Sequence, residues 1–128
     1  MNRRTAALVA LMAFAVGCKK YPYVSLLDGT WTGNANDASG TALPMTNDFT
    51  YDDKDEKFYG TVDIGGYVFT VDGVTSDKKA AEILMVNPLF PAGGSLKNVT
   101  VEEDTNMSGD YAMPDLTLSG TFTLTLAE

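Results

Sequence analysis

The sequence predicts an all-β fold: a single antiparallel up-and-down barrel of about eight strands, with a small β-sandwich as the alternative. The strongest observation is the stretch 116–126, where apolar residues and one glycine alternate with threonine or serine. Such alternation is typical of a strand with one buried and one solvated face. The other two observations are turns that bring apolar faces together, and connections short enough to join neighbouring antiparallel strands.

Alternation and turn residues together define the expected strands. They lie near residues 28–35, 42–51, 57–64, 67–73, 79–86, 95–103, 106–112 and 115–126. The stretch 78–86 also suits a helical turn or two, because alanine, glutamate, leucine and methionine favour helices. Residues 87–94 are expected to form a loop, because they contain Pro88, Pro91, Gly93 and Gly94.

Three turns predict strand registers that gather apolar residues on one face. A two-residue turn at Gly65-Gly66 pairs Ile64 with Tyr67, Val62 with Phe69, Gly60 with Val71 and Phe58 with Gly73. A four-residue loop at 53–56 pairs Tyr51 with Phe58, Phe49 with Gly60 and Met45 with Ile64. A turn at Pro114-Asp115 pairs Met113 with Leu116, Tyr111 with Leu118 and Met107 with Phe122.

Glycines recur two residues before a large apolar side chain, as in Gly29-Thr30-Trp31 and Gly120-Thr121-Phe122. Glycines on the inward face permit the sharp coiling of a small barrel. The expected inward residues are Trp31, Phe49, Tyr51, Phe58, Val62, Tyr67, Phe69, Val71, Ile83, Met107, Tyr111, Leu118 and Phe122. These rings either fill the interior as a core or line a cup for a small apolar ligand. In the second case Trp31, Phe49, Tyr67, Phe69 and Tyr111 are the candidate ligand-binding residues.

The Gly29-Thr30-Trp31 motif on the first strand, followed by up-and-down strands, resembles the start of lipocalin- and avidin-like barrels, the calycin group. The resemblance implies a binder of a small hydrophobic ligand. Lipocalins pack an arginine from a late strand on that tryptophan, and this chain has no arginine after Arg4.

The N-terminus has the organisation of an export signal. Arg3 and Arg4 precede an apolar stretch, 5–14, and small residues follow. About 10 apolar residues are too few to span a bilayer, which needs roughly 20 in a helix. The segment therefore predicts a cleaved signal peptide rather than a transmembrane helix.

Ala15-Val16-Gly17-Cys18 resembles the lipobox of bacterial lipoproteins, with Ala15 where leucine is usual. The resemblance implies cleavage before Cys18, a diacylglycerol on its thiol and an acyl chain such as palmitate on its amino group, with no other cofactor. Lys19 stands where the inner-membrane retention signal of enterobacteria has aspartate, which implies sorting to the outer membrane. The barrel would then face the periplasm or the cell surface. The expected division is a signal peptide, 1–17, a lipidated tether, 18–27, and a barrel domain, 28–128.

Two other fates of the N-terminus stay open. Ala13-Phe14-Ala15 is itself a cleavage site for ordinary signal peptidase, and cutting there would release a secreted protein with a free cysteine. The segment could also remain uncleaved as an anchor.

The composition restricts the chemistry. Removing residues 1–17 lowers the basic residues from 9 to 7 against 17 acidic residues, a net charge of −10, and leaves no arginine; the chain has no histidine. Such a domain lacks imidazole catalysis and bidentate anion clamps, and its charge disfavours nucleic acid. We therefore expect a non-catalytic, membrane-anchored envelope lipoprotein, a structural module or a binder of an envelope protein or a small apolar ligand.

Acidic residues crowd two connections, at Asp52, Asp53, Asp55 and Glu56 and again at 102–104. Neither cluster has the spacing of an EF-hand calcium loop, so we expect solvated turns and no metal site. A carboxylate-based hydrolase is the remaining alternative, and it would need two carboxylates converging in a cleft.

Overall fold

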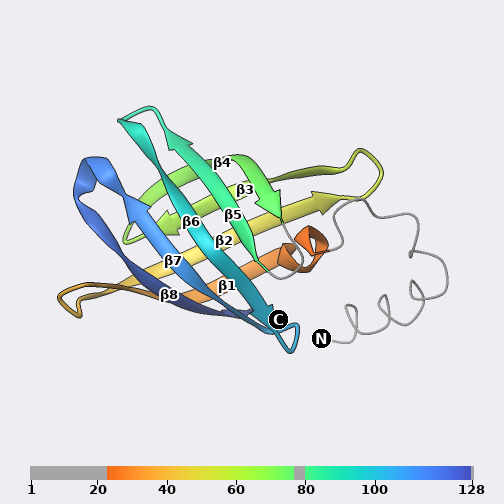
Figure 1. Cartoon of the computed structure of the whole chain (residues 1–128), viewed down its shortest axis with the longest axis horizontal. Coiled ribbons are helices and arrows are strands. Elements are labelled where there is room, and N and C mark those ends of the chain that lie inside the picture. The colour runs from red at the N-terminus through yellow and green to blue at the C-terminus, as the bar shows by residue number, and fades with distance from the viewer. Residues whose placement is uncertain (1–22, 77–79, 128) are drawn as a thin grey trace.

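The computed structural model describes residues 23–76 and 80–127, which form a closed eight-stranded barrel (Figure 1). The strands are β1 (Gly29–Asp37), β2 (Ala42–Asp52), β3 (Lys57–Ile64), β4 (Tyr67–Ser76), β5 (Ala81–Asn87), β6 (Phe90–Glu102), β7 (Asn106–Met113) and β8 (Leu118–Leu126). Each strand pairs antiparallel with the next in sequence, and β8 pairs with β1. The expected all-β up-and-down barrel is confirmed, and the barrel is the architecture rather than the alternative sandwich.

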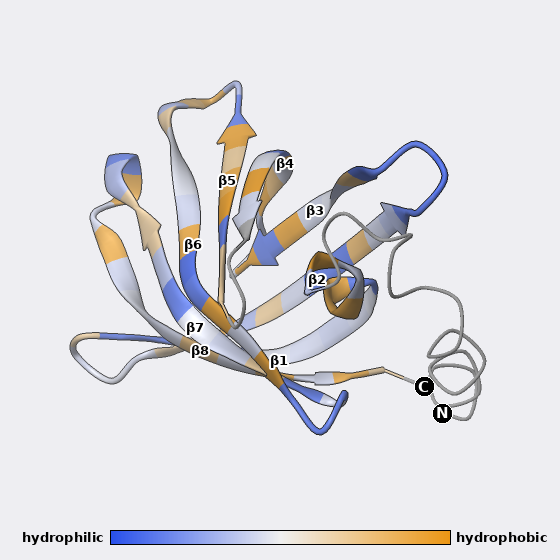
Figure 2. Cartoon of the chain, turned by 45° about the vertical axis from the view of Figure 1, so that its right-hand side comes forward, coloured by the Kyte–Doolittle hydropathy of each residue, from blue (hydrophilic) through white to orange (hydrophobic). Residues whose placement is uncertain are grey.

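The up-and-down topology sorts the connections into two ends of the barrel (Figure 1). One end, which we call the N-terminal end, carries the 3-10 helix η2 (Val24–Leu27), the loops 53–56 and 103–105, and the end of β8. The far end carries the turns 38–41, 65–66 and 88–89 and the 3-10 helix η3 (Pro114–Leu116). Both acidic connections therefore lie at the N-terminal end, and Figure 2 shows the β2–β3 loop there as strongly hydrophilic.

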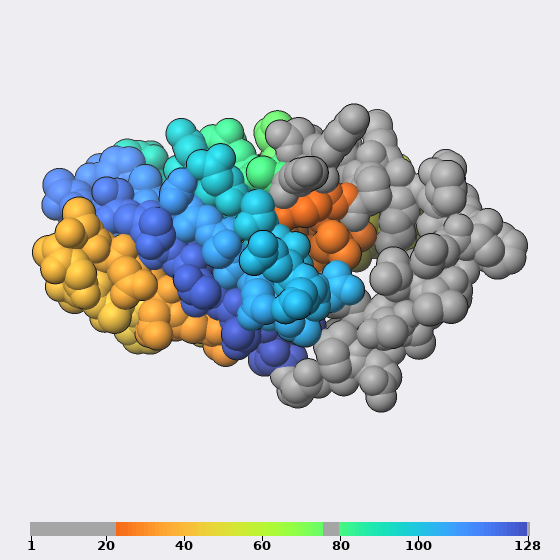
Figure 3. All heavy atoms as spheres, turned by 60° about the horizontal axis from the view of Figure 1, so that its bottom comes forward, coloured from red at the N-terminus to blue at the C-terminus, as the bar shows by residue number. Residues whose placement is uncertain are grey.

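Inward-facing glycines let the strands coil tightly enough to close the barrel. A Cβ atom on Gly120 would overlap the carbonyl oxygen of Asn36 on β1, and one on Gly60 would overlap that of Asp48 on β2. Neighbouring backbones therefore approach at positions that hold no larger residue. These close approaches at Gly60 and Gly120 agree with the role expected of the glycine motif. Figure 3 shows side chains of β8 lying against those of β1 where the barrel closes.

The β2–β3 register is confirmed in full, since Tyr51 pairs with Phe58, Phe49 with Gly60 and Met45 with Ile64. The β3–β4 register is confirmed only near its turn, where Ile64 pairs with Tyr67 and Val62 with Phe69. The expected pairs of Gly60 with Val71 and of Phe58 with Gly73 are wrong, because this ladder ends at Thr61 and Thr70.

The β7–β8 register differs from the prediction by two residues. Tyr111 pairs with Gly120 and Met107 with Leu124, because the connection is not a two-residue turn. Pro114–Leu116 form η3, and Thr117 follows with a φ of 52°. The connection is therefore four residues long, and β8 begins at Leu118 instead of 115. A shift of two residues keeps every side chain on its expected face, since the side-chain period of a strand is two.

The expected loop at 87–94 is wrong, because Phe90 already begins β6 and pairs with Asn87 across a turn at Pro88 and Leu89. The Asn87 side chain builds this turn: its Oδ1 accepts from the Leu89 N–H at 2.7 Å, and its Nδ2 donates to the Val68 carbonyl at 2.7 Å. Pro91 fits in β6 because pairing with β7 begins only at Ser95, so a missing N–H is tolerated there. Residues 81–87 form a strand and not a helical turn.

The folded domain also extends further toward the N-terminus than expected. Val24 and Leu27 of η2 are buried in the core, although we expected residues 18–27 to be a tether. The helix ends where Asp28 adopts an extended conformation, and Asp28 Oδ2 then accepts from the Tyr51 N–H at 2.8 Å. The two apolar side chains of η2 leave water by packing into the core at this end of the barrel. The helix therefore closes the N-terminal end, and we call it the plug.

Candidate functional site

The lipidation candidate, Cys18, lies outside the described residues, as do the signal peptide and Lys19. Tyr23 is the first described residue and is already bonded to the barrel. Its hydroxyl donates to the Val99 carbonyl at 3.0 Å and accepts from the Val101 N–H at 2.8 Å, both on β6. Five residue steps separate Cys18 from Tyr23, so the chain spans at most about 18 Å between them. An acyl chain on Cys18 would hold the N-terminal end of the barrel close to the membrane.

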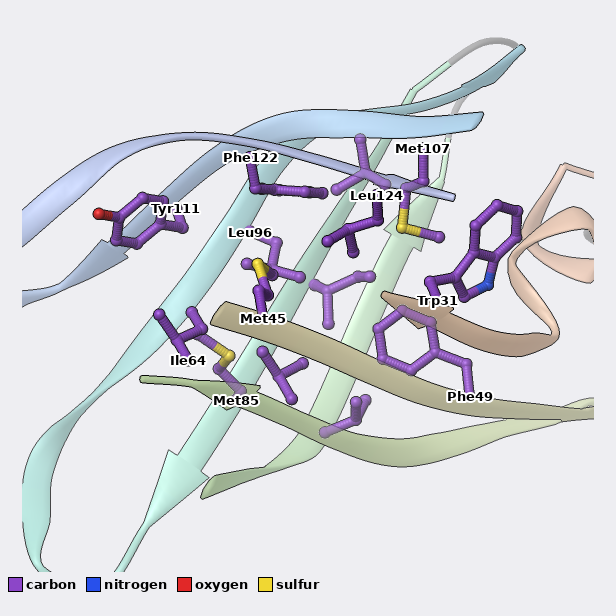
Figure 4. Close-up of a cluster of buried hydrophobic side chains, with 14 of the residues drawn as sticks. Trp31, Met45, Phe49, Ile64, Met85, Leu96, Met107, Tyr111, Phe122 and Leu124 are labelled. Atoms are coloured by element: carbon purple, nitrogen blue, oxygen red, sulfur yellow. The ribbon is translucent and has the colours of Figure 1, made fainter. Parts of the chain in front are cut away.

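The barrel interior is packed with side chains (Figure 4). Four of the five candidate ligand-binding residues are buried in it, with exposed fractions of 0% for Trp31 and Phe69, 1% for Phe49 and 2% for Tyr111. Side chains exposed this little leave almost no water-sized space beside them. The structure therefore brings these four residues together as a core.

The fifth candidate, Tyr67, was predicted to line the interior. This prediction is wrong, because its side chain is 39% exposed. It flanks the Gly65-Gly66 turn at the far end of the barrel, where it pairs with Ile64. Its ring instead contacts Phe90 edge-on, with 5.6 Å between ring centroids, and Phe90 stacks on Phe69 at 6.0 Å. Tyr51, Phe58 and Leu118, also expected inside, are only partly buried.

The plug is tied to the core through Trp31. Its indole Nε1 donates to the Leu27 carbonyl at 2.9 Å, and the bond is buried. This bond satisfies the polar atom of the largest core residue, which otherwise would cost free energy to bury. Trp31 thus has a structural role that sequence patterning alone did not reveal.

Sequence reasoning missed two features of the interior. One is how much methionine it contains: Met45, Met85, Met107 and Met113 are all buried, with exposed fractions of 2% or less, and only Met107 was among the expected inward residues. Methionine side chains are flexible and fit irregular gaps. The other is Asn47, which lies between Met45 and Phe49 on β2 and is fully buried. Strict alternation along 42–51 was the signal that could have placed it inside.

The amide of Asn47 is poorly satisfied in this apolar surrounding. Its Nδ2 lies 3.7 Å from the Met107 sulfur, a weak acceptor, and its Oδ1 has no hydrogen-bond partner among the described residues. A buried polar atom without a partner costs about 1–3 kcal/mol. Such exceptions to the packing rules concentrate at functional sites, so Asn47 is the most informative polar residue inside the barrel.

The buried hydroxyl of Tyr111 also has no hydrogen-bond partner among the described residues. Burial raises the pKa of this phenol above its usual value of 10.0, and the negative charge of Asp37 raises it further. Asp37 is the last residue of β1 and precedes the turn 38–41 at the far end, where its Oδ1 accepts from the Ser39 hydroxyl at 2.7 Å and the Thr41 N–H at 2.9 Å. These bonds lower the pKa of the Asp37 carboxyl below 3.8.

The acidic connections act as turn residues. Asp52 Oδ1 accepts from the backbone N–H groups of Lys54 and Asp55 at 2.9 and 3.3 Å. Glu56, Glu103 and Asp104 adopt positive φ values of 54°, 55° and 60°. No group of three histidine, cysteine, aspartate or glutamate side chains among residues 23–76 and 80–127 is placed to hold a metal ion. The described part of the chain also contains no helix long and apolar enough to span a membrane.

Large apolar side chains are exposed on the outer face of β4 and β5 toward the far end. Val68, Leu84 and Val86 have exposed fractions of 49%, 46% and 44%, and Leu89 in the adjacent turn reaches 80%.

Comparison with known proteins supports the fold alone. No family model matches the chain, and no curated protein matches it. A solved structure described as a redesigned β-barrel is similar, with a TM-score of 0.58 and 16% sequence identity over 86% of this chain and 98% of the other. At 16% identity this similarity supports the barrel fold and carries no information on function.

Proposed function

We propose that this protein is a bacterial lipoprotein, anchored by acylated Cys18 in the outer membrane, whose barrel is a non-catalytic module that binds another envelope protein. The observation that carries the proposal is the occupied interior. Trp31, Phe49, Phe69, Tyr111 and Phe122 expose 2% of their surface or less, and η2 closes one end. A barrel filled by its own side chains is suited to presenting an outer surface rather than to enclosing a ligand.

The sequence supports the anchored part of this proposal. The lipobox-like Ala15-Val16-Gly17-Cys18 follows a short apolar stretch, and only four residues separate Cys18 from Tyr23. Absence of histidine, and of arginine beyond Arg4, supports the non-catalytic part. The acidic side chains in the turns bond to their own backbone, so a carboxylate-based hydrolase gains no support from them.

Asn47 favours a second candidate, a calycin-like binder of a small apolar molecule. Its Oδ1 is an unused acceptor inside an interior lined by four buried methionines, whose flexible side chains can repack around a guest. The ligand would be mainly apolar and would carry one hydrogen-bond donor.

Native mass spectrometry of the full-length protein, extracted from bacterial membranes in detergent, tests both candidates. We expect the mass of residues 18–128 plus a diacylglycerol and an acyl chain, and a Cys18→Ala variant lacking both. An unacylated Cys18 in the membrane-extracted protein would overturn the anchor. A small apolar molecule retained by the wild-type chain and lost from an Asn47→Val variant would favour the ligand binder instead.

A further inference from the structure

The barrel wall is split between β3 and β4 toward the N-terminal end. The ladder joining them contains four pairs, from Thr61–Thr70 to Ile64–Tyr67, although β3 has 8 residues and β4 has 10. Residues 57–60 of β3 continue to pair with β2, and residues 71–76 of β4 continue to pair with β5. We call these two uncoupled edges the seam.

Two local features cause the strands to part where the ladder ends. Gly60 has a φ of 153°, which few residues other than glycine adopt, and β3 continues to pair with β2 on both sides of it. On β4 the register with β5 shifts between Val71 and Gly73, which marks a β-bulge. Bulges bend a strand and increase its twist, so β4 follows β5 away from β3.

The seam leaves backbone groups of β3 without a ladder partner. Gly65 N–H donates to the Pro44 carbonyl on β2 at 2.8 Å, so the odd-numbered residues of β3 direct their backbone groups to β2. The even-numbered residues direct theirs to β4. The last pair, Thr61–Thr70, lies between hydrogen-bonded positions, so the Gly60 carbonyl still faces the Val71 N–H. Beyond that point the ladder offers no partner to the Gly60 N–H or to the N–H and carbonyl of Phe58.

A similar end of pairing between β5 and β6, also toward the N-terminal end, is covered by a side chain. The β5–β6 ladder ends at Ala81 and Val99, and the Tyr23 hydroxyl then bonds the Val99 carbonyl and the Val101 N–H. Natural proteins protect unpaired edges in this way, because a free edge is a template for another strand. The seam lacks such a cover among the described residues.

Charge indicates what would occupy the seam. The loop 53–56 stands at its open end, and the exposed carboxylates of Asp55 and Glu56 directly precede β3. The chain as a whole carries a net charge of −8, with Lys57 the one basic residue of β3. A second copy would bring the same acidic loop and be repelled, whereas a basic peptide would be attracted.

We propose that the seam between β3 and β4 binds an extended basic segment of a partner protein by strand addition to the backbone of Phe58 and Gly60. Main-chain hydrogen bonds supply the affinity in such complexes, and alternate side chains supply the specificity. Tyr59, 50% exposed between those two residues, offers a ring for apolar side chains of the added strand. The inference rests on the proposed protein-binding function and names its site and the class of its partner.

The test uses the full-length acylated protein in detergent micelles and three synthetic peptides of eight residues. One alternates lysine and valine, the second has the same sequence with every backbone N–H methylated, and the third alternates glutamate and valine. We expect the first peptide to bind, and the other two to bind at least about tenfold more weakly, because they lose the main-chain bonds or the charge complementarity. In amide NMR spectra Phe58 and Gly60 should shift and exchange more slowly on binding.

Two matched variants test the charge contribution. The double variant Asp55→Asn with Glu56→Gln should weaken binding of the basic peptide roughly threefold to tenfold, as expected for the loss of two exposed ion pairs. Glu102→Gln with Glu103→Gln removes the same charge from the other acidic connection and should change binding less than about twofold.

Four outcomes would contradict peptide binding at the seam. The basic peptide does not bind, or the methylated peptide binds equally well. The other two are NMR shifts confined to the Val68–Leu84–Val86 face, and slow amide exchange at Phe58 and Gly60 without peptide. Concentration-dependent dimerisation that slows the same amides would assign the seam to a second copy. The peptide assay does not depend on the anchor. If the protein proves to be unacylated but binds the basic peptide, the seam proposal stands and the lipoprotein proposal is rejected. If the protein is acylated but does not bind the peptide, only the anchor proposal stands.

Discussion

At the scale of single residues, Asn47 is where the barrel departs most from its own packing. Its amide oxygen is buried without a partner in the described structure, at a cost of about 1–3 kcal/mol. Asn47→Val removes both amide atoms and suits a strand, so the free energy of unfolding should rise by about 1 kcal/mol after some repacking. Urea denaturation measures the change. Thr46→Val, on the exposed face of the same strand, serves as the control and should shift stability little. A destabilised Asn47→Val would mean that the amide makes a favourable interaction.

Tyr111 gives the barrel a dependence on alkaline pH. Burial and Asp37 raise the pKa of its phenol in the folded state, so the folded chain holds this proton more tightly than the unfolded chain. The stability that the neutral phenol contributes is complete below the unfolded pKa of about 10 and is lost as pH rises through the folded pKa. Tyr111→Phe should therefore flatten the fall in melting temperature between about pH 9.5 and 11. Tyr59→Phe, at a half-exposed position, should leave that fall unchanged.

At the scale of elements, the Tyr23 hydroxyl supplies two of the bonds that hold the start of the plug to β6. Tyr23→Phe keeps the ring but leaves the Val99 carbonyl and the Val101 N–H without their bonds, which are partly buried. We expect a loss of about 1–3 kcal/mol in the free energy of unfolding. Exchange of the Val101 amide hydrogen should accelerate more than that of amides near the far end. Uniform acceleration over all strands would show that the plug and the barrel unfold as one unit.

The close approach of β8 to β1 at Gly120 leads to a second prediction at the scale of elements. Gly120→Ala would place a methyl group against the Asn36 carbonyl, whereas Gly73→Ala meets no atom within 4 Å, and neither glycine has a positive φ. We expect Gly120→Ala to destabilise the barrel by about 1–3 kcal/mol, as overpacking does. Gly73→Ala should change stability by less than about 1 kcal/mol. Thermal unfolding of the pair compares them. Equal effects would show that coiling does not depend on contact at Gly120.

The elements also show how far sequence patterning reaches. Period-two alternation and the Gly65-Gly66 turn predicted which residues face inward along most strands, because burial on one face restricts each position locally. The split at Gly60, the four-residue connection at Pro114 and the early start of β6 at Phe90 depend on how strands bend against their neighbours. The plug was missed because Val24 and Leu27 have no alternation, and they are buried only because the barrel leaves an open end to fill. Asn47 followed the pattern but was overlooked because a polar residue was not expected inside.

At the scale of the whole molecule, the short link between Cys18 and the plug should fix the orientation of the barrel on a membrane. An acylated Cys18 would lie within about 18 Å of Tyr23, so the N-terminal end would face the lipid. β2 has 11 residues, and strands of that length tilted by about 40° place the far end roughly 25–30 Å higher. The molecule would then hold its acidic loops and the seam near the headgroups and its exposed apolar side chains away from them.

Energy transfer from a single label to a dye in the bilayer tests this orientation. With Cys18 acylated, a cysteine introduced at Lys54 or at Ala38 is the thiol that reacts; both positions are exposed, in connections at opposite ends of the barrel. In liposomes carrying the full-length protein, transfer should be strong from Lys54→Cys and weak from Ala38→Cys, because the two labels differ in height by roughly the length of the barrel. Equal transfer would mean that residues 19–22 let the barrel lie on its side. In that case the seam would be reached from the solvent as easily as from the membrane surface.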